Sequence, residues 1–559
     1  MDMSAANRKG LSLFALIMIG LGSIFGSGWL FGAGRAATVA GPAAIVAWVI
    51  GAVLIGMIAM SYAELGAAYP LPGSMARFGA LSHGPVLGFI TGWAGWIAIA
   101  ALIPIESIAG TQYMSSWNFG WARGLVENGG LTTSGMAMAL FLTVALWLAC
   151  YWSVALLAKA NNLLTLVKFA IPVLAVIALI ASGFHPGNFT DHGGFAPNGW
   201  SAVMTAVTTS GVVFAFNGFQ AVVNLGGAAK NPGRAIPLAL VGALSLGLVI
   251  YLALQIAFIG GVPPEKLAEA GGWSGIDFSS PFADLAKMLM LHWVVTMLQF
   301  GAFISPSGAN IGNVASASYM AQNLADTGFF PKKIREVHPR YGTARPAMWL
   351  NLGFSVLLLV TVGHSWEALA GVVSAAMVVS YLIGPVAVGV LRATKPELPR
   401  PFRLPAARIL CPVTFAFAAC ALYWSKWPDT GKVVLLTLVA APIAAVVLQR
   451  RGEKNLVRQF APAWWMIVFL LWLGTLSALG SEEFGGRGVI PGGVDIAVVG
   501  LSALGFYFWA VRSGVKAHCA GLPGPDPILD AAPAGAAAET GATGATGATD
   551  VPEHALSHA

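Results

Sequence analysis

The sequence predicts an all-α integral membrane protein with about fourteen transmembrane helices. Of its 559 residues, 57% are hydrophobic and only 9% are charged, against roughly a quarter charged in soluble globular proteins. Apolar runs of about 20 residues, the length that crosses a bilayer, recur along most of the chain. No alternating ten-residue pattern indicates a membrane β-barrel. This composition excludes a soluble enzyme, a nucleic-acid-binding module and a disordered scaffold.

The candidate spans follow one another with mostly short connections. Backbone polar groups in lipid must be satisfied within the protein, so runs of this length favour helices over strands. The first run is too long for a signal peptide, and we expect it to be retained. Residues 261–291 are expected to hold a short helix over the outer face. The predicted spans are residues 12–39, 43–66, 84–113, 134–152, 160–182, 200–227, 235–260, 292–321, 346–363, 368–392, 407–426, 430–449, 462–480 and 494–513.

The basic residues predict the orientation in the membrane. If the N-terminus is cytoplasmic, most of the 30 Lys and Arg residues fall in inside segments, as the positive-inside rule requires. We therefore expect a multi-pass protein of the plasma (inner) membrane with both termini cytoplasmic. Residues 1–11 form the N-terminal segment, and the Ala/Gly-rich residues 514–559 are expected to be a disordered tail. The four cysteines have no metal-site spacing, and we expect neither a metal nor a cofactor.

The first span carries a cluster of glycines near its middle. It reads GLGSIFGSG at residues 20–28, and each glycine weakens a helix by about 1 kcal/mol relative to alanine. Irregular backbone at membrane depth survives only where it lines a cavity or packs within protein. The N-terminus of the outer half-helix would then attract an anion such as a carboxylate. The alternative is that these glycines serve only close helix packing.

The sixth span has a matching irregularity. It reads FAFNGFQ at residues 214–220 and so places two amide side chains and a glycine in mid-span. Interrupted helices at corresponding positions of two halves are a sequence sign of a transporter site. The two irregular segments are five spans apart, an odd number, so the second half would be inverted relative to the first.

Three segments resemble the amino acid–polyamine–organocation (APC) superfamily of permeases. GSIFGSG at residues 22–28 is similar to the glycine motif of its first helix. YAELG at residues 62–66, with the prolines that follow, is similar to the end of its second helix, and KNPGRAIP at residues 230–237 to the loop after its sixth. The resemblance implies a LeuT-like five-plus-five inverted repeat with discontinuous helices 1 and 6. The transport core would span residues 12–392, and residues 407–513 would add four helices.

The resemblance also implies how a substrate would bind. Its carboxylate would take the Ser27 hydroxyl and the N–H groups of Ser27 and Gly28. Its ammonium would meet carbonyl groups near Ser23, Ile24, Phe214 and Asn217, with Phe214 as a gating aromatic. Some polyamine-type and arginine-type relatives carry a glutamate where Gln220 stands, so Gln220 argues against a cationic substrate. The supporting residues would be Gly22, Gly26, Gly218, Gln220, Ser305 and Ser307.

Three ionisable residues fall within predicted spans, where each needs a reason. Lys168 either extends its ammonium back to the membrane interface or carries a proton. The resemblance favours the second role, because in proton-coupled relatives a similar lysine occupies the place of a sodium ion and bridges the first and eighth helices. Glu106 is a candidate for the substrate ammonium or a proton. Arg35 either pairs with Glu106 or attracts an acidic side chain of the substrate. Glu64, at the end of span two, is expected to be solvated or to cap its helix.

Together these features predict a secondary transporter and not an enzyme. No histidine lies in mid-span, and no hydrolase or nucleotide-binding motif is present. The leading hypothesis is proton-coupled symport of an acidic or small neutral amino acid, with protons and the lipid bilayer as further partners and no nucleic acid. The alternatives are an amino acid exchanger without net proton coupling, or a permease-like nutrient receptor or channel.

Overall fold

A computed structural model of the chain describes residues 11–522 apart from residues 71–73, 153, 226–228 and 340–342. Most of these residues are helical and almost none are in strands, which confirms the predicted all-α class. The described strands form one short antiparallel hairpin, β1 (Val126–Glu127) and β2 (Gly130–Leu131). The predicted N-terminal segment up to residue 10 and the tail from residue 523 lie outside the described residues.

The helices up to residue 182 cover the first five predicted spans, and two short helices lie in the connections between them. They are α1 (Leu13–Ile24), α2 (Gly28–Ala40), α3 (Ala44–Ala68), α4 (Phe78–His83), α5 (Pro85–Ala100), α6 (Leu102–Met114), α7 (Gly120–Arg123), α8 (Thr133–Trp152) and α9 (Val154–Ser182).

The next helices coincide with predicted spans six to ten. They are α10 (Gly199–Thr209), α11 (Val212–Ala215), α12 (Phe219–Asn224), α13 (Pro232–Gly261), α14 (Pro264–Glu269), α15 (Pro281–Met288), α16 (His292–Asp326), α17 (Arg345–Thr361), α18 (Trp366–Tyr381) and α19 (Ile383–Thr394). The expected short helix in residues 261–291 is present as α14, and α15 follows it.

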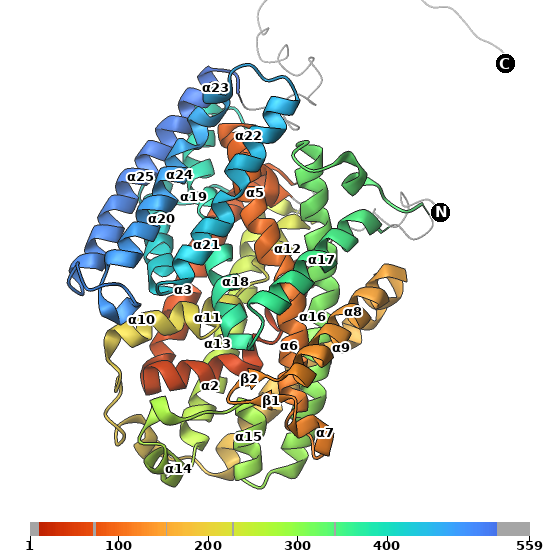
Figure 1. The fold of residues 1–559 in the computed structure, drawn as a ribbon, viewed down its shortest axis with the longest axis vertical. Coiled ribbons are helices and arrows are strands. Elements are labelled where there is room, and N and C mark those ends of the chain that lie inside the picture. The colour runs from red at the N-terminus through yellow and green to blue at the C-terminus, as the bar shows by residue number, and fades with distance from the viewer. Residues whose placement is uncertain (1–10, 71–73, 153, 226–228, 340–342, 523–559) are drawn as a thin grey trace, which may run out of the picture. The chain divides into compact units, whose positions relative to one another are not determined.

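The last helices coincide with the four predicted additional spans. They are α20 (Ala407–Trp424), α21 (Asp429–Leu438), α22 (Ala440–Arg450), α23 (Leu456–Phe460), α24 (Trp464–Leu479) and α25 (Val494–Cys519). This group packs against α3, α10, α18 and α19 (Figure 1). The helix α25 continues to Cys519, beyond the predicted end of its span at residue 513, because Gly514 and Ala517 are still in contact with the rest of the protein.

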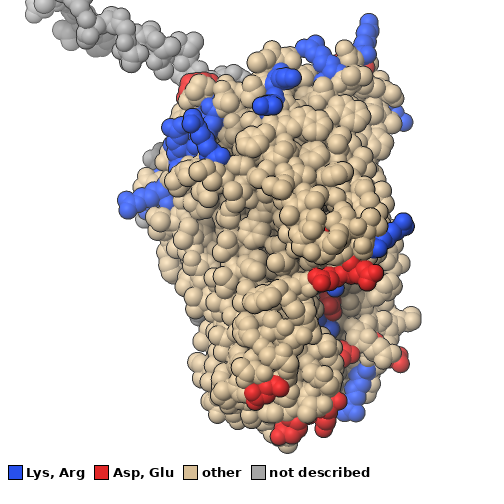
Figure 2. Space-filling view, turned by 90° about the vertical axis from the view of Figure 1, so that its left-hand side faces the viewer, with Lys and Arg blue, Asp and Glu red and all other residues tan. Residues whose placement is uncertain are grey.

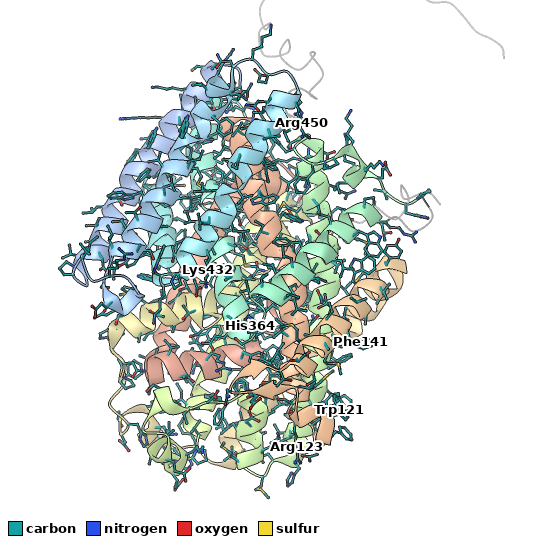
Figure 3. The ribbon with its side chains drawn as sticks, in the orientation of Figure 1. Trp121, Arg123, Phe141, His364, Lys432 and Arg450 are labelled. Carbon is teal, nitrogen blue, oxygen red and sulfur yellow. The ribbon has the colours of Figure 1, made fainter. Side chains whose placement is uncertain are left out.

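Nine helical segments among the described residues are long and apolar enough to cross a membrane, and four further apolar helices are shorter. The fourteen crossings and the inverted repeat therefore stay predictions. Connections predicted on opposite sides do lie at opposite ends. Helices α7, α14 and α15 lie at the lower end of Figure 1 and α22 and α23 at the upper end, as do Arg123 and Arg450 in Figure 3.

The charged side chains follow the same division. On the face drawn in Figure 2, most Lys and Arg residues lie towards the upper end and most Asp and Glu residues towards the lower end. Over the left and centre of this view a broad uncharged band separates them, as expected for a surface that contacts lipid. Which end faces the cytoplasm stays a prediction.

Both predicted helix interruptions are present. Between α1 and α2, residues 25–27 leave the helical path, and the Gly26 N–H bonds the carbonyl of Ile24 instead of a carbonyl four residues back. Between α10 and α12 the chain breaks twice, at Gly211 with φ +82° and at Gly218 with φ +138°. Both φ values lie in the region that favours glycine. We call residues 25–27 the first break and residues 216–218 the second break.

Candidate functional site

The two breaks lie against each other, and glycine makes this approach possible. A Cβ atom added to Gly218 would lie 2.7 Å from the backbone N of Ile24, and one added to Gly28 would lie 2.8 Å from the Cβ of Ala215. Both distances are shorter than side-chain contacts permit. Glycine therefore allows close packing at points where the helices are also interrupted, and binding of a ligand by the interrupted backbone stays a prediction.

Side chains from α13 and α16 bind the carbonyl groups that the breaks release. The Tyr251 hydroxyl lies 3.0 Å from the carbonyl of Ile24 and 3.1 Å from that of Ala215, so it bridges the two interrupted helices. The Ser305 hydroxyl lies 3.0 Å from the carbonyls of both Phe25 and Gly26. Buried carbonyls need such partners. Ser305 was predicted as a supporting residue, whereas Tyr251 was missed.

Some of the predicted substrate contacts are already used by the protein. The Ile24 carbonyl, expected to meet the ammonium, accepts from Tyr251, and Ser23 beside it is exposed. Gly22 is half-buried at the end of α1. Ser307 makes no hydrogen bond to the first break in the described part of the chain, so of the two predicted serines only Ser305 contacts it.

Glu106 on α6 lies at the first break. A Cβ on Gly26 would collide with Glu106 Oε1, and the carboxyl group lies beside the hydroxyl and backbone N–H of Ser27. The side chain is 3% exposed, and its Oε2 atom has no hydrogen-bond partner among the described residues. The N-terminus of α2, where a substrate carboxylate is expected, thus faces an internal carboxyl group.

Lys168 on α9 is 2% exposed, which contradicts the alternative that its ammonium extends back to the interface. It interacts electrostatically with Glu106, although no ion pair joins the two in the described residues. The neighbouring Phe169 packs edge-on against Phe25 in the first break, with ring centroids 5.0 Å apart. Lys168 therefore lies inside the protein, next to the interrupted helix.

The Ser27 hydroxyl is held by an aromatic side chain from α18. The Trp366 indole N–H donates to Ser27 Oγ at 2.9 Å. The same ring stacks on Phe31 at 4.7 Å and meets Phe214 edge to face at 5.5 Å. The predicted gating aromatic Phe214 therefore contacts a second aromatic that the sequence did not indicate. In this conformation, Trp366 covers the group expected to bind the substrate carboxylate.

Arg35 does not pair with Glu106, so that interpretation of Arg35 is wrong. Its guanidinium lies 3.5 Å from Glu367 and 3.8 Å from Asp277. Arg35 is seven residues beyond Gly28, about 10 Å along the helix, whereas Glu106 lies at the start of that helix. Glu367 directly follows Trp366, so two successive residues of α18 hold α2 at points about two turns apart.

The second break carries a chain of three polar side chains. The Tyr381 hydroxyl donates to Asn217 Oδ1 at 2.8 Å and accepts from Gln220 Nε2, while Gln220 Oε1 accepts from the Gly218 N–H at 3.0 Å. A pocket adjoins this chain. No charged residue lines it in the described part of the chain. Its polar lining comes from Gln220, Tyr381, Tyr62, Thr91, Asn224 and Ser380.

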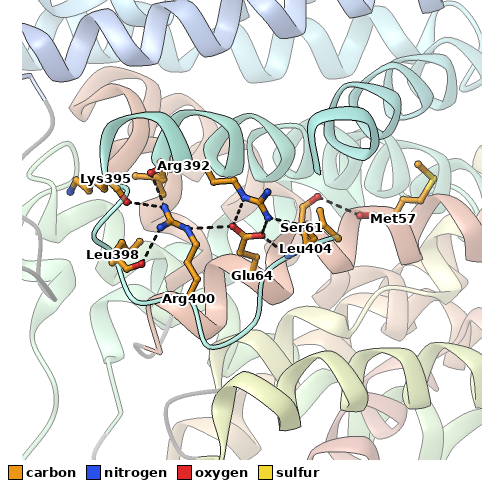
Figure 4. A network of polar contacts seen from close by, with 9 residues as sticks. Met57, Ser61, Glu64, Arg392, Lys395, Leu398, Arg400 and Leu404 are labelled. Carbon is orange, nitrogen blue, oxygen red and sulfur yellow. Dashed lines mark hydrogen bonds and ion pairs between the residues drawn. The ribbon is translucent and has the colours of Figure 1, made fainter. Parts of the chain in front are cut away.

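Glu64 is neither solvated nor a cap, which corrects that expectation. It is 2% exposed and binds the Arg392 guanidinium through both oxygens, at 2.9 and 2.5 Å (Figure 4). It also lies 3.5 Å from Arg400 Nε and accepts the Leu404 N–H at 2.7 Å. The arginines were assigned to orientation alone, so their pairing was missed. The carboxylate therefore ties α3 both to α19, which carries Arg392, and to the linker between α19 and α20.

Replacing Glu64 with glutamine is expected to destabilise the protein by about 3 kcal/mol, because removing one member of a buried ion pair leaves the other uncompensated. Thermal unfolding in detergent measures this loss. The matched control is Glu269→Gln, whose side chain is 69% exposed beside Lys266. Equal melting temperatures for the two variants would contradict a structural role for Glu64.

Facing breaks in two apolar helices, with buried ionisable side chains beside them, are the architecture of secondary-transporter sites. The amino acid permease family matches residues 11–439 of the chain. The chain therefore belongs to this family, within the APC superfamily, as its motifs predicted.

Characterised relatives cover almost the whole chain. The glutamate/serine transporter AimA of Bacillus subtilis (strain 168) is 47% identical over 517 residues, which is 92% of this chain and 95% of that protein. The aspartate-proton symporter of the same organism is 35% identical over 513 residues, 91% of this chain and 97% of the relative. The branched-chain amino acid permease BcaP is 24% identical over 80% of this chain and 95% of its own length.

Proposed function

We propose that the protein is a proton-coupled symporter that carries an acidic or small neutral amino acid across the plasma membrane. The observation that carries this proposal is Glu106, a buried carboxyl group at the N-terminus of α2 whose Oε2 atom has no hydrogen-bond partner among the described residues. Protonation would change the charge at the place where the substrate carboxylate is expected, and Lys168 would respond to that change. Binding of the proton and binding of the substrate are then linked.

The relatives support the same function. One is named a glutamate/serine transporter and another an aspartate-proton symporter. The substrates in these names are acidic or small and neutral, and one of the names includes proton coupling. Ser27, Gly28 and the break carbonyls would hold the amino acid backbone. Exchange without net proton movement, or a receptor or channel role, remains the alternative that the transport assays below separate from symport.

We propose that Arg35 helps to close the outer side of the substrate site and does not bind the substrate, because its guanidinium already lies between two carboxylates. Glu367 and Trp366 would then release α2 together when the site opens. If Arg35 has this role, the protein should prefer the same substrates with and without the Arg35 side chain.

A competition panel tests this part of the proposal. Twenty amino acids compete with a labelled substrate in proteoliposomes containing the parent, Arg35→Ala or Arg35→Lys. We expect glutamate, aspartate and serine to inhibit most. Arg35→Ala should alter the transport rate for all of them alike, and Arg35→Lys less so. Selective loss of inhibition by the acidic amino acids in Arg35→Ala would instead make Arg35 a substrate-binding residue.

A further inference from the structure

We propose that Gly218, Gln220 and Tyr381 form a directed hydrogen-bond relay that turns the Asn217 amide so that its N–H groups face the substrate. The site then selects amino acids whose side chain carries an oxygen acceptor. This inference rests on the proposed function and adds to it a positioning residue, Tyr381, and a physical basis for the substrate class.

The direction of the relay follows from its first member. A backbone N–H can only donate, so the Gln220 atom that the Gly218 N–H contacts, at 3.0 Å, must be the amide oxygen. The other end of the Gln220 side chain is then NH₂, which can only donate, and it donates to the Tyr381 hydroxyl oxygen. The Tyr381 proton is left to donate to Asn217 Oδ1 at 2.8 Å.

This chain of bonds fixes the Asn217 amide, which would otherwise be free to turn over. With Oδ1 bound to Tyr381, the Nδ2 group is the end that remains for a ligand. Within the described part of the chain, no hydrogen bond joins Nδ2 to another protein group, and Asn217 is 9% exposed. Asn217 is also a member of the second break, which lies against Ser23 and Ile24 of the first half.

The surroundings of Gln220 and Tyr381, the two side chains that hold the Asn217 amide, are uncharged. Among the described residues, the pocket beside them is lined by uncharged side chains alone. In such an environment a hydrogen-bonding group without a partner is costly, and a fixed dipole discriminates more strongly than it would in water. A ligand group that accepts a hydrogen bond is therefore favoured over one that donates and over an apolar one.

The chemical class of the side chain follows. Carboxylate and hydroxyl oxygens both accept from an amide N–H, so acidic and hydroxyl-bearing amino acids suit the same donor. An aliphatic side chain would leave that donor unpaired. A side-chain ammonium would face a group of the wrong polarity.

We also expect that one substitution at position 220 reverses the preference for a side chain that accepts a hydrogen bond. A carboxylate at position 220 has no hydrogen to donate, so the Tyr381 hydroxyl would donate to it and accept from Asn217 Nδ2. Asn217 would turn over and present its oxygen to the substrate. The Gln220→Glu variant, assayed at about pH 8 to favour the ionised carboxyl, should therefore accept a side chain that donates.

Three amino acids with side chains of the same length test the polarity of the Asn217 amide. The side chain of glutamate accepts a hydrogen bond, that of ornithine donates one, and that of norleucine does neither. Inhibition of labelled-substrate uptake is measured beside ligand-induced thermal stabilisation of purified protein, so that selectivity is read independently of transport. We expect the parent to prefer glutamate over norleucine by about tenfold, the effect of one hydrogen bond to a charged group. Gln220→Glu should raise the relative affinity for ornithine by about tenfold.

The Tyr381→Phe variant interrupts the relay. It should bring the three probes to within about twofold of one another, and adding Gln220→Glu to it should change nothing further, because the signal passes through the missing hydroxyl. Tyr62→Phe is the matched control. Its hydroxyl, in the same pocket, bonds the Ser380 carbonyl at 3.3 Å and takes no part in the relay, so the parent's preference should persist.

The possible outcomes distinguish a failure of the proposed relay from a failure of the proposed function. If uptake is proton-driven but the parent prefers norleucine, or if Gln220→Glu and Tyr381→Phe keep the parent's preference, the relay is wrong and the proposed function stands. If Gln220→Glu acts equally with and without the Tyr381 hydroxyl, Tyr381 is not the positioning residue. If the parent neither binds nor transports any amino acid, both proposals are wrong.

Discussion

Replacing Gly218 with alanine is expected to abolish amino acid uptake. At φ +138° an alanine is strained, at a cost of roughly 1–3 kcal/mol for such a backbone position. Its Cβ would also lie 2.7 Å from Ile24 N, so the two breaks would have to separate. Because the proposed site is formed where these breaks meet, even a variant that still folds should lose transport.

Gly353→Ala is the matched control for this prediction. Gly353 lies inside α17, and a Cβ added there meets no atom within 4 Å, so uptake and melting temperature should stay close to the parent's. Uptake by Gly218→Ala within about twofold of the parent would show that contact between the two breaks is not required.

Neutralising Glu106 or Lys168 should separate transport from the proton gradient. Glu106→Gln mimics a permanently protonated carboxyl group, and Lys168→Ala removes the buried ammonium with which it interacts. Both variants should still exchange labelled for unlabelled substrate, yet an inward proton gradient should no longer accelerate net uptake. A single buried charge change of this kind alters a linked equilibrium by an order of magnitude or more.

The control is Asp495→Asn, which neutralises a buried carboxyl group outside the proposed site. Asp495 is 1% exposed in α25, where it accepts from the Tyr423 hydroxyl at 2.5 Å and the Ser481 N–H at 3.2 Å. Its variant should keep the gradient response even if it is less stable. Full gradient stimulation of Glu106→Gln would remove that residue from the coupling mechanism.

The sequence predicted the helices and their interruptions because these depend on local composition. Apolar length determines where a helix can span, and the glycines at residues 20–28 and at Gly218 mark where it breaks. The buried ionisable residues Glu106 and Lys168 were likewise recognisable, since a charge within an apolar run has few structural reasons to be there.

The partners of these residues were not predictable because they come from distant parts of the chain. Tyr251 reaches a carbonyl 227 positions away, Tyr381 an amide 164 positions away, and Trp366 a hydroxyl 339 positions away. Each is an aromatic residue in an apolar helix, where packing alone would explain it. Only the contact shows that its polar atom is used.

The errors over Arg35 and Glu64 have a related cause. Pairing with Glu106 was one of two interpretations of Arg35, but neither the direction of its helix nor the position of α18 could be read from composition. Glu64 was judged by its place at a helix end, although the linker carrying Arg400 folds back over it. Charge pairing across long separations depends on tertiary structure, which the pattern of apolar runs does not encode.

The most direct test of the central claim is uptake of labelled glutamate or serine by the purified parent protein in proteoliposomes, with and without an inward proton gradient. We expect accumulation above equilibrium only with the gradient, accompanied by proton entry and absent from Lys168→Ala. Equal uptake with and without the gradient, with Lys168→Ala behaving like the parent, would contradict it and favour the exchanger. No uptake or exchange of any amino acid would exclude a transporter of this class.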